Sequence, residues 1–299
     1  MKILVTGATG YIGSKVLECA TANGATAEAL VRRPMPWTVP HRVYVSDLSA
    51  KSIAAILKTV RPDAIFHLAA HTSAGCGPAD ADTLVEANLV FGARLLAAFF
   101  ELGGGIFLNA GSYWEYDEQG RYAPNTLYAA TKRAFHDLLV YYSSRENITA
   151  ATLVLFDVYG PGDRRAKLVP QMISSVKQGA SLKATGGEQV LNLVHVNDVA
   201  EGFFKTAAAL PVPGKQRDCP VYALDGDQPC TVRELAAHIS RLAGRELKMS
   251  WGAREYGKSQ IFRPVTGLPR PPGWRPQVSL ENGLRRLLEE SVPDQKEAR

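Results

Sequence analysis

Residues 2–13 of the chain are Lys-Ile-Leu-Val-Thr-Gly-Ala-Thr-Gly-Tyr-Ile-Gly. The apolar run at 3–5 is typical of a strand buried on both faces of a parallel sheet, and a helical pattern begins at Tyr11. Glycines between such a strand and helix allow a tight turn and a close approach of backbone to a pyrophosphate, which the helix N-terminus attracts. The stretch therefore predicts a dinucleotide-binding loop, with an ordinary strand–helix turn as the alternative.

Short apolar runs recur along the chain, and most are separated by helical patterns such as 127–145 and 196–209. The runs after the first strand are 25–31, 42–45, 64–68, 106–109, 151–155 and 221–224. Alternation of strand and helix predicts an α/β protein, with a Rossmann-type doubly wound parallel sheet covered by helices on both faces.

The texture of the chain changes after Gly160-Pro161-Gly162, where prolines become frequent. We expect residues 1–160 to form the dinucleotide-binding domain, with 190–225 returning to it. Residues 161–189 and 226–299 are expected to form a smaller, discontinuous substrate-binding part. The polar tail from Ser291 is expected to fray.

Composition narrows the classes of function. Thirty-four Lys and Arg against 29 Asp and Glu leave a formal net charge of +5, but no dense basic run with interleaved aromatic residues predicts nucleic-acid binding. The four cysteines are scattered without the spacing of metal ligands, which favours reduced thiols, a cytoplasmic protein and no metal. We find no long uncharged apolar stretch and expect no membrane association.

The second strand ends in Ala29-Leu30-Val31-Arg32-Arg33, where an NAD-binding protein usually carries an acidic residue. An arginine at this place can bind the 2′-phosphate of NADP in a forked geometry. We therefore expect NADP, with NAD possible. The alternative is that Arg32 and Arg33 are solvated loop charges.

Three residues suggest alcohol–ketone chemistry. Tyr128 and Lys132 lie four residues apart on a predicted helix and so share one face, where an ammonium would lower the pKa of the tyrosine. Ser112 follows the fifth predicted strand, at the sheet edge where ligands bind. Ser112 would orient a carbonyl and Tyr128 would exchange the proton. A chance Tyr and Lys on an amphipathic helix is the alternative.

Taken together, these motifs resemble the extended short-chain dehydrogenase/reductases. The Gly-x-x-Gly-x-x-Gly spacing at Gly7 and the order Ser112, Tyr128, Lys132 carry the resemblance. Two further stretches resemble those of the nucleotide-sugar epimerases and dehydratases of this family. They are 158–162 (Val-Tyr-Gly-Pro-Gly) and 195–199 (His-Val-Asn-Asp-Val).

The resemblance implies two sets of binding residues in addition to the catalytic three. For the cofactor they are Gly7, Thr9, Gly10, Tyr11, Ile12, Gly13, Arg32, Asp47, Leu48, Leu68, Ala69, Ala70, Asn88, Tyr128 and Lys132. For a nucleoside-diphosphate sugar they are Ser73, Tyr113, Trp114, Asp157, Lys167, Arg254 and Arg263. The last three cations are equally well explained as solvated charges. His67 is expected to be structural.

Departures from the family pattern reduce the number of reactions that this chain is expected to catalyse. Tyr113-Trp114 stand where the 4,6-dehydratases carry Asp-Glu, so dehydration is not expected. Residues 190–193, Val-Leu-Asn-Leu, lack the arginine with which most sugar epimerases of the family grip the diphosphate. The stretches 108–114, 127–132, 156–160 and 187–189 look most like those of CDP-abequose and CDP-paratose synthases.

That resemblance implies NADPH-dependent reduction, at C4, of a nucleoside-diphosphate-linked 4-keto-6-deoxy or 3,6-dideoxy sugar. Two alternatives stay open. One is an NAD-dependent nucleotide-sugar 4-epimerase that uses the same three residues. The other is a non-catalytic protein that senses dinucleotides on an enzyme fold.

A homodimer is also expected. The predicted helices 81–102 and 127–145 carry apolar residues on more than one face, and related proteins pair these helices in a four-helix bundle. The residues concerned are Leu95, Leu96, Phe99, Phe100, Leu138, Leu139 and Tyr142. The alternative is that the second part of the chain covers them.

Overall fold

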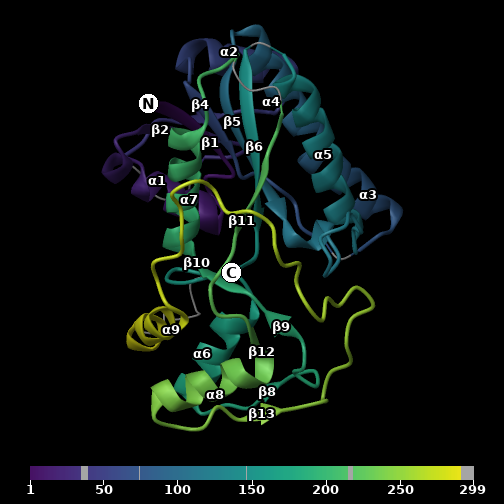
Figure 1. The fold of residues 1–299 in the computed structure, drawn as a ribbon, viewed down its shortest axis with the longest axis vertical. Coiled ribbons are helices and arrows are strands. Elements are labelled where there is room, and N and C mark those ends of the chain that lie inside the picture. Colours follow the sequence, from purple (N-terminus) through teal and green to yellow (C-terminus); the bar gives the residue numbers. More distant parts are fainter. Residues whose placement is uncertain (35–39, 74, 146, 215–217, 291–299) are drawn as a thin grey trace.

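The computed structural model describes residues 1–34, 40–73, 75–145, 147–214 and 218–290, so the expected fraying from Ser291 lies outside the described residues. Its centre is a seven-stranded sheet in the order β11-β6-β5-β4-β1-β2-β3 (Figure 1). Every neighbouring pair in this sheet is parallel. The strands are β1 (Lys2–Thr6), β2 (Thr26–Val31), β3 (Val43–Val45), β4 (Ala64–His67), β5 (Gly105–Ser112), β6 (Ile148–Leu155) and β11 (Val221–Leu224).

Helices cover both faces of the sheet, which confirms the doubly wound α/β class. On one face α1 and α7 bury Val16, Leu17 and Phe203 against the strands. On the other face α2, α4 and α5 bury Ile53 and Phe135 in a second core. These helices are α1 (Tyr11–Cys19), α7 (Val196–Ala209), α2 (Ala50–Val60), α4 (Phe91–Glu101) and α5 (Leu127–Ser143).

The single helix predicted over 81–102 is divided. It consists of α3 (Pro78–Val85), a π-helical turn η2 (Glu86–Val90) and α4. By length and composition alone, the whole run Pro78–Glu101 is long and apolar enough to cross a membrane, although it carries charged residues such as Glu86 and Arg94. Its side chains Leu84, Phe91, Leu95, Leu96 and Phe99 are buried in this fold, which accounts for its apolar composition.

A smaller part lies beyond the carboxyl edge of the sheet (Figure 1). Three helices surround a third core that includes Met172, Leu235 and Leu284. They are α6 (Leu168–Gln178), α8 (Val232–Ala243) and α9 (Leu280–Glu289). Three strand pairs complete it: β7 (Asp157–Tyr159) with β10 (Leu193–His195), β9 (Val190–Leu191) with β12 (Cys230–Thr231), and β8 (Leu182–Lys183) with β13 (Met249–Ser250).

Residues 190–225 are shared between the two parts. In this segment β11 pairs with β6 of the large sheet, and α7 packs on its face beside α1. Strand β9 instead pairs with β12, next to α8 of the smaller part. The two parts are therefore connected by several chain crossings rather than by one linker.

A buried tryptophan fixes the C-terminal segment to the large part. The indole Nε1 of Trp274 donates a hydrogen bond to the carbonyl oxygen of Asp198 at 2.9 Å. The Asp198 carboxylate accepts a second bond, of 3.0 Å, from the backbone nitrogen of Val278. Asp198 lies in the first turn of α7, so one residue anchors the segment that leads into α9.

We expect Asp198→Ala to lower the free energy of unfolding by about 1–3 kcal/mol, because the Val278 N–H loses its acceptor. Urea denaturation followed by circular dichroism measures this. The control is Glu201→Ala on the same helix, whose ion pair with Lys205 at 3.6 Å is exposed and should contribute less than about 1 kcal/mol. Equal losses in the two variants would contradict the assigned role.

Candidate active site

The glycine loop between β1 and α1 lies directly against the end of β4. A Cβ atom on Gly7 would come within 2.6 Å of the backbone nitrogen of Ala69, and one on Gly13 within 2.2 Å of the carbonyl oxygen of Gly7. Gly7 also has a positive φ of 68°, which favours glycine. Two of the predicted cofactor glycines are thus required by the fold itself, and they leave bare backbone at the start of α1.

This loop fits a dinucleotide. The N-cap of α1, Gly10, has no side chain to satisfy the first N–H groups of the helix, which leaves them to an anion such as a pyrophosphate. Thr9 and Gly10 are exposed, as are Arg32 and Arg33 just past the end of β2. Gly7, Thr9, Gly10 and Ile12 would hold a pyrophosphate here, and the arginines a 2′-phosphate.

The loops after β3 and β4 lie at the same sheet edge. Asp47 is exposed, and its carboxylate accepts a hydrogen bond from the backbone nitrogen of Ser49 at 2.9 Å. Leu48, with a φ of 63°, turns the chain beside it. His67 is fully buried, its Nδ1 lies 2.9 Å from the Thr6 hydroxyl, and burial lowers its pKa to about 3. His67 is therefore a neutral structural residue, as expected.

The side chain of Asn88 is held by hydrogen bonds to two other segments of the chain. Its amide donates to the carbonyl oxygen of His71 at 2.9 Å and to the Thr131 hydroxyl at 3.0 Å. Its carbonyl oxygen accepts from the backbone nitrogen of His71 at 2.7 Å. The buried side chain of Asn88 joins the loop after β4 to α5 and so fixes the position of that loop. A direct contact between Asn88 and a cofactor stays a prediction.

The three predicted catalytic residues meet. Ser112 ends β5 and is mostly buried, and its side chain lies near that of Tyr128, whose pKa it acts to lower. Tyr128 and Lys132 lie one turn apart on α5, which begins at the N-cap Thr126. The Lys132 side chain is buried, with 2% exposure. A hydroxyl, a phenol and an ammonium at one sheet edge form an arrangement suited to proton exchange with an alcohol or ketone.

The charges in this centre differ from the sequence-based expectation. Burial, and after it the charge of Glu115, raises the pKa of Tyr128, whereas Lys132 was expected to lower it. Burial lowers the pKa of Lys132 to about 8, against the opposing effect of Glu115. Glu115 is a buried carboxyl that the sequence analysis missed, and it lies three residues after Ser112. The spacing Ser-x-x-Glu of a capping box was the available signal.

Several predicted substrate residues are grouped around Asp157. The Tyr113 hydroxyl donates to its carboxylate at 3.2 Å, and the Tyr113 ring stacks on Phe156. Burial raises the pKa of Asp157 to about 6, and the nearby charge of Lys167 lowers it in part. Trp114 meets the Tyr128 ring edge-on, with centroids 6.1 Å apart. Tyr113 and Trp114 therefore lie beside the predicted catalytic residues, with Asp157 against Tyr113, while Lys167 is related to this group only through its charge near Asp157.

The remaining predicted substrate residues are more dispersed. Arg263 is exposed and reaches the Glu118 carboxylate at 3.9 Å, which places it over the loop that follows Trp114. Arg254 lies in the turn after β13, where its backbone nitrogen donates to Ala184. The Ser73 hydroxyl donates to Asp80 at 2.8 Å. These contacts bring Arg263, but not Arg254 or Ser73, into contact with the loop next to the catalytic residues.

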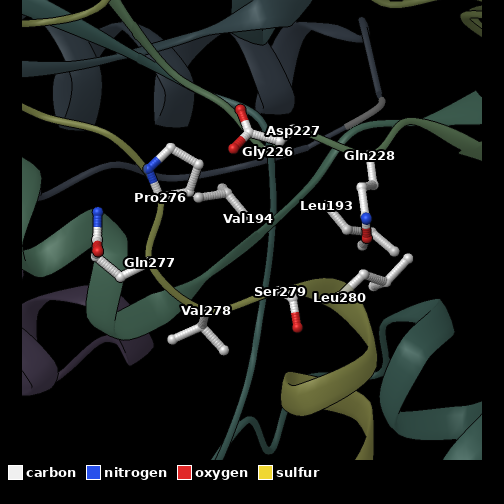
Figure 2. Close-up of a pocket in the computed structure, with 10 residues that line it drawn as sticks. All are labelled: Leu193, Val194, Gly226, Asp227, Gln228, Pro276, Gln277, Val278, Ser279 and Leu280. Carbon is white, nitrogen blue, oxygen red and sulfur yellow. The ribbon is translucent and has the colours of Figure 1, made fainter.

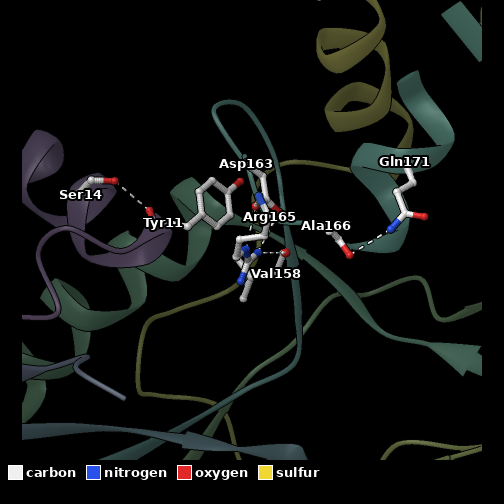
Figure 3. A network of polar contacts seen from close by, with 7 residues as sticks. All are labelled: Tyr11, Ser14, Val158, Asp163, Arg165, Ala166 and Gln171. Atoms are coloured by element: carbon white, nitrogen blue, oxygen red, sulfur yellow. Dashed lines mark hydrogen bonds and ion pairs between the residues drawn. The ribbon is translucent and has the colours of Figure 1, made fainter. Parts of the chain in front are cut away.

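A network of polar contacts connects the glycine loop with the loop after β7 (Figure 3). The guanidinium of Arg165 lies over the ring of Tyr11, 4.6 Å from its centroid. Arg165 also forms a forked ion pair with Asp163, at 2.7 and 2.8 Å, and donates to the carbonyl oxygen of Val158 at 3.1 Å. Tyr11 is therefore held from the smaller part of the chain, a contact that sequence spacing did not indicate.

Two neighbouring cavities lie away from these residues, near the start of α9. One has a volume of about 160 Å³, and Figure 2 shows residues 276–280 forming a wall opposite Leu193 and Val194. The second, of about 390 Å³, shares Gln228, Ser279 and Leu280 with the first. None of the predicted catalytic, cofactor or substrate residues lines either cavity. Among the described residues no group of His, Cys, Asp and Glu is arranged to hold a metal.

Comparison with known proteins agrees with this geometry. The description "NAD dependent epimerase/dehydratase family" matches residues 3–216. A CDP-abequose synthase from Yersinia pseudotuberculosis is 27% identical over 266 residues, which cover 88% of this chain and 92% of the relative. A CDP-abequose synthase from Salmonella typhimurium is 24% identical, with coverages of 96% and 97%.

Solved structures share the fold along nearly the whole chain. MoeE5 in complex with UDP-glucose and NAD is similar with a TM-score of 0.83 and 25% identity, covering 97% of this chain and 98% of that one. The UDP-glucose 4-epimerase of Thermus thermophilus in complex with NAD has a TM-score of 0.79 and 23% identity, with coverages of 96% and 98%. The chain belongs to the NAD dependent epimerase/dehydratase family, and it is an extended short-chain dehydrogenase/reductase.

Proposed function

We propose that the protein reduces the C4 carbonyl of a nucleoside-diphosphate-linked 4-keto-6-deoxy or 3,6-dideoxy sugar with NADPH. The coarser part, an NAD(P)-dependent enzyme that modifies nucleotide sugars, follows from its family and relatives. The observation that carries the finer part is that Ser112, at the end of β5, lies near a Tyr128 that stays protonated, one helical turn from the buried Lys132. Similarity to CDP-abequose synthases supports a CDP-linked sugar as the first substrate to test.

The mechanism follows from where each side chain lies. A reduced nicotinamide held on the glycine loop would supply the hydride to C4. Ser112 donates a hydrogen bond to the carbonyl oxygen and holds it beside Tyr128, which gives its proton to that oxygen as negative charge develops. Lys132 stabilises the tyrosinate left behind until solvent returns the proton. One ketone, one hydride and one proton thus give one alcohol.

One feature favours reduction over reversible epimerisation, and it lies in the cofactor site rather than at Tyr128, whose protonated form serves both reactions. Arg32 and Arg33 stand exposed past β2 and suit the 2′-phosphate of NADP, which a reductase exchanges at each turnover. The buried arrangement of Ser112, Tyr128 and Lys132 argues against a sensor without activity.

A 4-epimerase is the second candidate, because UDP-glucose 4-epimerases are among the relatives, for example that of Mycolicibacterium smegmatis at 24% identity. Cofactor stoichiometry separates the two reactions. A reductase oxidises one NADPH for each sugar reduced. An epimerase retains NAD through purification and consumes none, so finding tightly held NAD and no net oxidation would replace the proposal with this candidate.

Tyr128→Phe should lower the turnover number by about 10²–10⁴-fold, since it removes the proton donor and leaves the ring in place. Ser112→Ala should lower the turnover number less than Tyr128→Phe, because Ser112 orients the carbonyl without a net proton transfer. Lys132→Met should impair both turnover and NADPH binding. Single-turnover NADPH oxidation with a CDP-linked 4-keto sugar, and NADPH titration by fluorescence, measure these effects.

The matched control is Tyr44→Phe, which removes a phenolic oxygen on the edge strand β3 and should retain wild-type turnover. Near wild-type oxidation of NADPH by Tyr128→Phe would refute the mechanism. A wild-type protein that binds dinucleotide but turns over no nucleotide sugar would favour the sensor.

The wild-type enzyme should use NADPH in preference to NADH. Arg32→Asp should weaken the use of NADPH by about 10–100-fold, because it removes a cation that faces the 2′-phosphate and adds a repelling charge. Ratios of kcat/KM for the two cofactors measure the effect. Arg245→Asp, the same change in the turn after α8, should leave the ratio unchanged. Equal efficiency of the wild type with both cofactors would overturn the preference.

The homodimer stays a proposal, and the apolar residues named for it divide between a face packed inside the chain and a face left more open. Leu95, Leu96, Phe99 and Leu139 are buried within the chain, because α4 and α5 pack on the sheet and on each other. The expected residues Phe100, Leu138 and Tyr142 are half-buried. The exposed apolar surface of α3 and α5 is formed by Val85, Val140 and Tyr141.

Light scattering should therefore give twice the chain mass of 32.4 kDa across micromolar concentrations. Tyr141→Glu should shift the equilibrium towards monomer, since this ring is 54% exposed on α5 and a buried unpaired charge weakens an interface. Phe262→Glu, at a comparable 47% exposure in the loop after β13, is the control. A monomeric wild type would reject the dimer.

A further inference from the structure

Glu115 is a carboxyl buried in the catalytic centre that the proposed mechanism does not use. It has 1% exposure and follows Ser112 by three residues, in the short helix η3 (Tyr113–Glu115). Its Oε1 accepts a 2.7 Å hydrogen bond from the backbone nitrogen of Ser112. Its Oε2 is also buried and has no hydrogen-bond partner in the described part of the chain. A buried, half-satisfied carboxyl is costly and needs a compensating neighbour.

We propose that Glu115 is a positioning residue of this centre: its carboxylate anchors the backbone of Ser112 and provides the counter-charge of the buried Lys132 ammonium. The inference rests on the proposed function in assigning Ser112 and Lys132 to catalysis. Its test, however, measures charges in the protein before any substrate is added.

The anchoring role is given by hydrogen bonds. Ser112 and Glu115 form a capping box, in which the Ser112 hydroxyl accepts from the backbone nitrogen of Trp114 at 3.3 Å while Glu115 accepts from that of Ser112. Both bonds fix the residue whose side chain lies near Tyr128. The neighbouring Gly111 makes room for the carboxyl, since a Cβ there would come within 3.2 Å of Oε1.

The counter-charge role is given by burial and by packing, because η3, which carries Glu115, contacts α5, which carries Lys132. Lys132 has 2% exposure, and in the described part of the chain no carboxylate forms an ion pair with it. Burial alone would remove the proton of such a lysine near neutral pH. The charge of Glu115 acts in the opposite direction and holds the pKa of Lys132 at about 8. The titratable groups that interact with Glu115 are Tyr128, Lys132, Arg133 and Asp137 from α5, and Tyr116 beside it.

The interaction is reciprocal, as two coupled titrations must be. Burial raises the pKa of Glu115 to about 7, and the charges of Lys132 and Arg133 lower it. Above that pH the site holds a carboxylate and an ammonium together. When pH rises through about 8 the ammonium is lost, and with it the charge to which the proposed mechanism assigns the stabilisation of the tyrosinate.

The chain contains a matched control. Thr231 and Glu234 form a second capping box at the start of α8, with a 2.7 Å bond from the Thr231 nitrogen to the Glu234 carboxylate. This glutamate is exposed, and its helix α8 packs mainly against α9 and α6 of the smaller part. Glu115→Gln and Glu234→Gln therefore make the same change in the same local geometry, and each glutamine keeps an oxygen that can accept the capping bond.

The experiment follows the lysine signals by carbon-13 NMR in protein labelled at lysine Cε, without cofactor or substrate. The Lys132 signal is assigned by its loss in Lys132→Met. Glu115→Gln should lower the Lys132 titration midpoint by about one pH unit, because the opposing charge is gone. Glu234→Gln should leave it unchanged. An unchanged midpoint in Glu115→Gln would overturn the proposal.

Kinetics give an independent measurement. With the sugar substrate, the alkaline fall of kcat should move to lower pH in Glu115→Gln by a similar amount, with KM for the sugar within about two-fold of wild type. A change in KM alone, or an equal loss at every pH, would indicate only a structural role. If the wild type is inactive with the sugar, that counts against the proposed function. The NMR titration would still measure the interaction between Glu115 and Lys132.

If Glu115→Gln does not fold, the proposal is tested instead by titrating Glu115 in a variant of Lys132. In Lys132→Met labelled at glutamate Cδ, the Glu115 midpoint should rise above its wild-type value, since a nearby positive charge has been removed. A midpoint that does not rise would show that the two charges are not coupled and would overturn the proposal.

Discussion

A contact between two stretches of backbone, at the ends of β1 and β4, determines the geometry of the site. There is no space for a Cβ on Gly7 beside Ala69, so the loop can approach β4 only as glycine. The loop in turn directs the N-terminus of α1 along the sheet edge. Because all seven strands are parallel, β5 delivers Ser112 to that same edge. The cofactor loop and the catalytic hydroxyl are thus brought together by strand pairing and one close approach.

The second constraint is the burial of charge. Lys132, Glu115 and Asp157 all have pKa values shifted towards the neutral form, and burial is the largest cause for each. Such burial lowers stability, but it also strengthens every remaining electrostatic interaction, because less water screens it. A centre that holds a carbonyl, a phenol and an ammonium in register benefits from this low dielectric. The burial that lowers the stability of the fold is therefore the same burial that strengthens the electrostatic interactions used by the proposed reaction.

Local patterns predicted most of the fold and indicated the three residues that we propose for catalysis, and long-range contacts explain the rest. The apolar strands and the i, i+4 relation of Tyr128 and Lys132 depend on neighbours in sequence, so periodicity was sufficient. The π turn at Asn88 depends on a clamp between two distant segments. The stacking of Arg165 on Tyr11 joins positions far apart in the chain. Glu115 was missed because the comparison with the dehydratases stopped at Trp114, one residue before it.

The cations near the site differ in how firmly the protein already holds them. Arg165 is held by a forked pair with Asp163 and a bond to Val158, so an incoming anion would have to compete with all three. Arg263 has one ion pair of 3.9 Å and is mostly exposed, which makes that pair weak. Residue Asn192, in the stretch without the family arginine, accepts from the Gly226 nitrogen and serves the fold. If the proposed substrate's diphosphate is bound by an arginine, the free energy of releasing its present partners would therefore be lower for Arg263 than for Arg165.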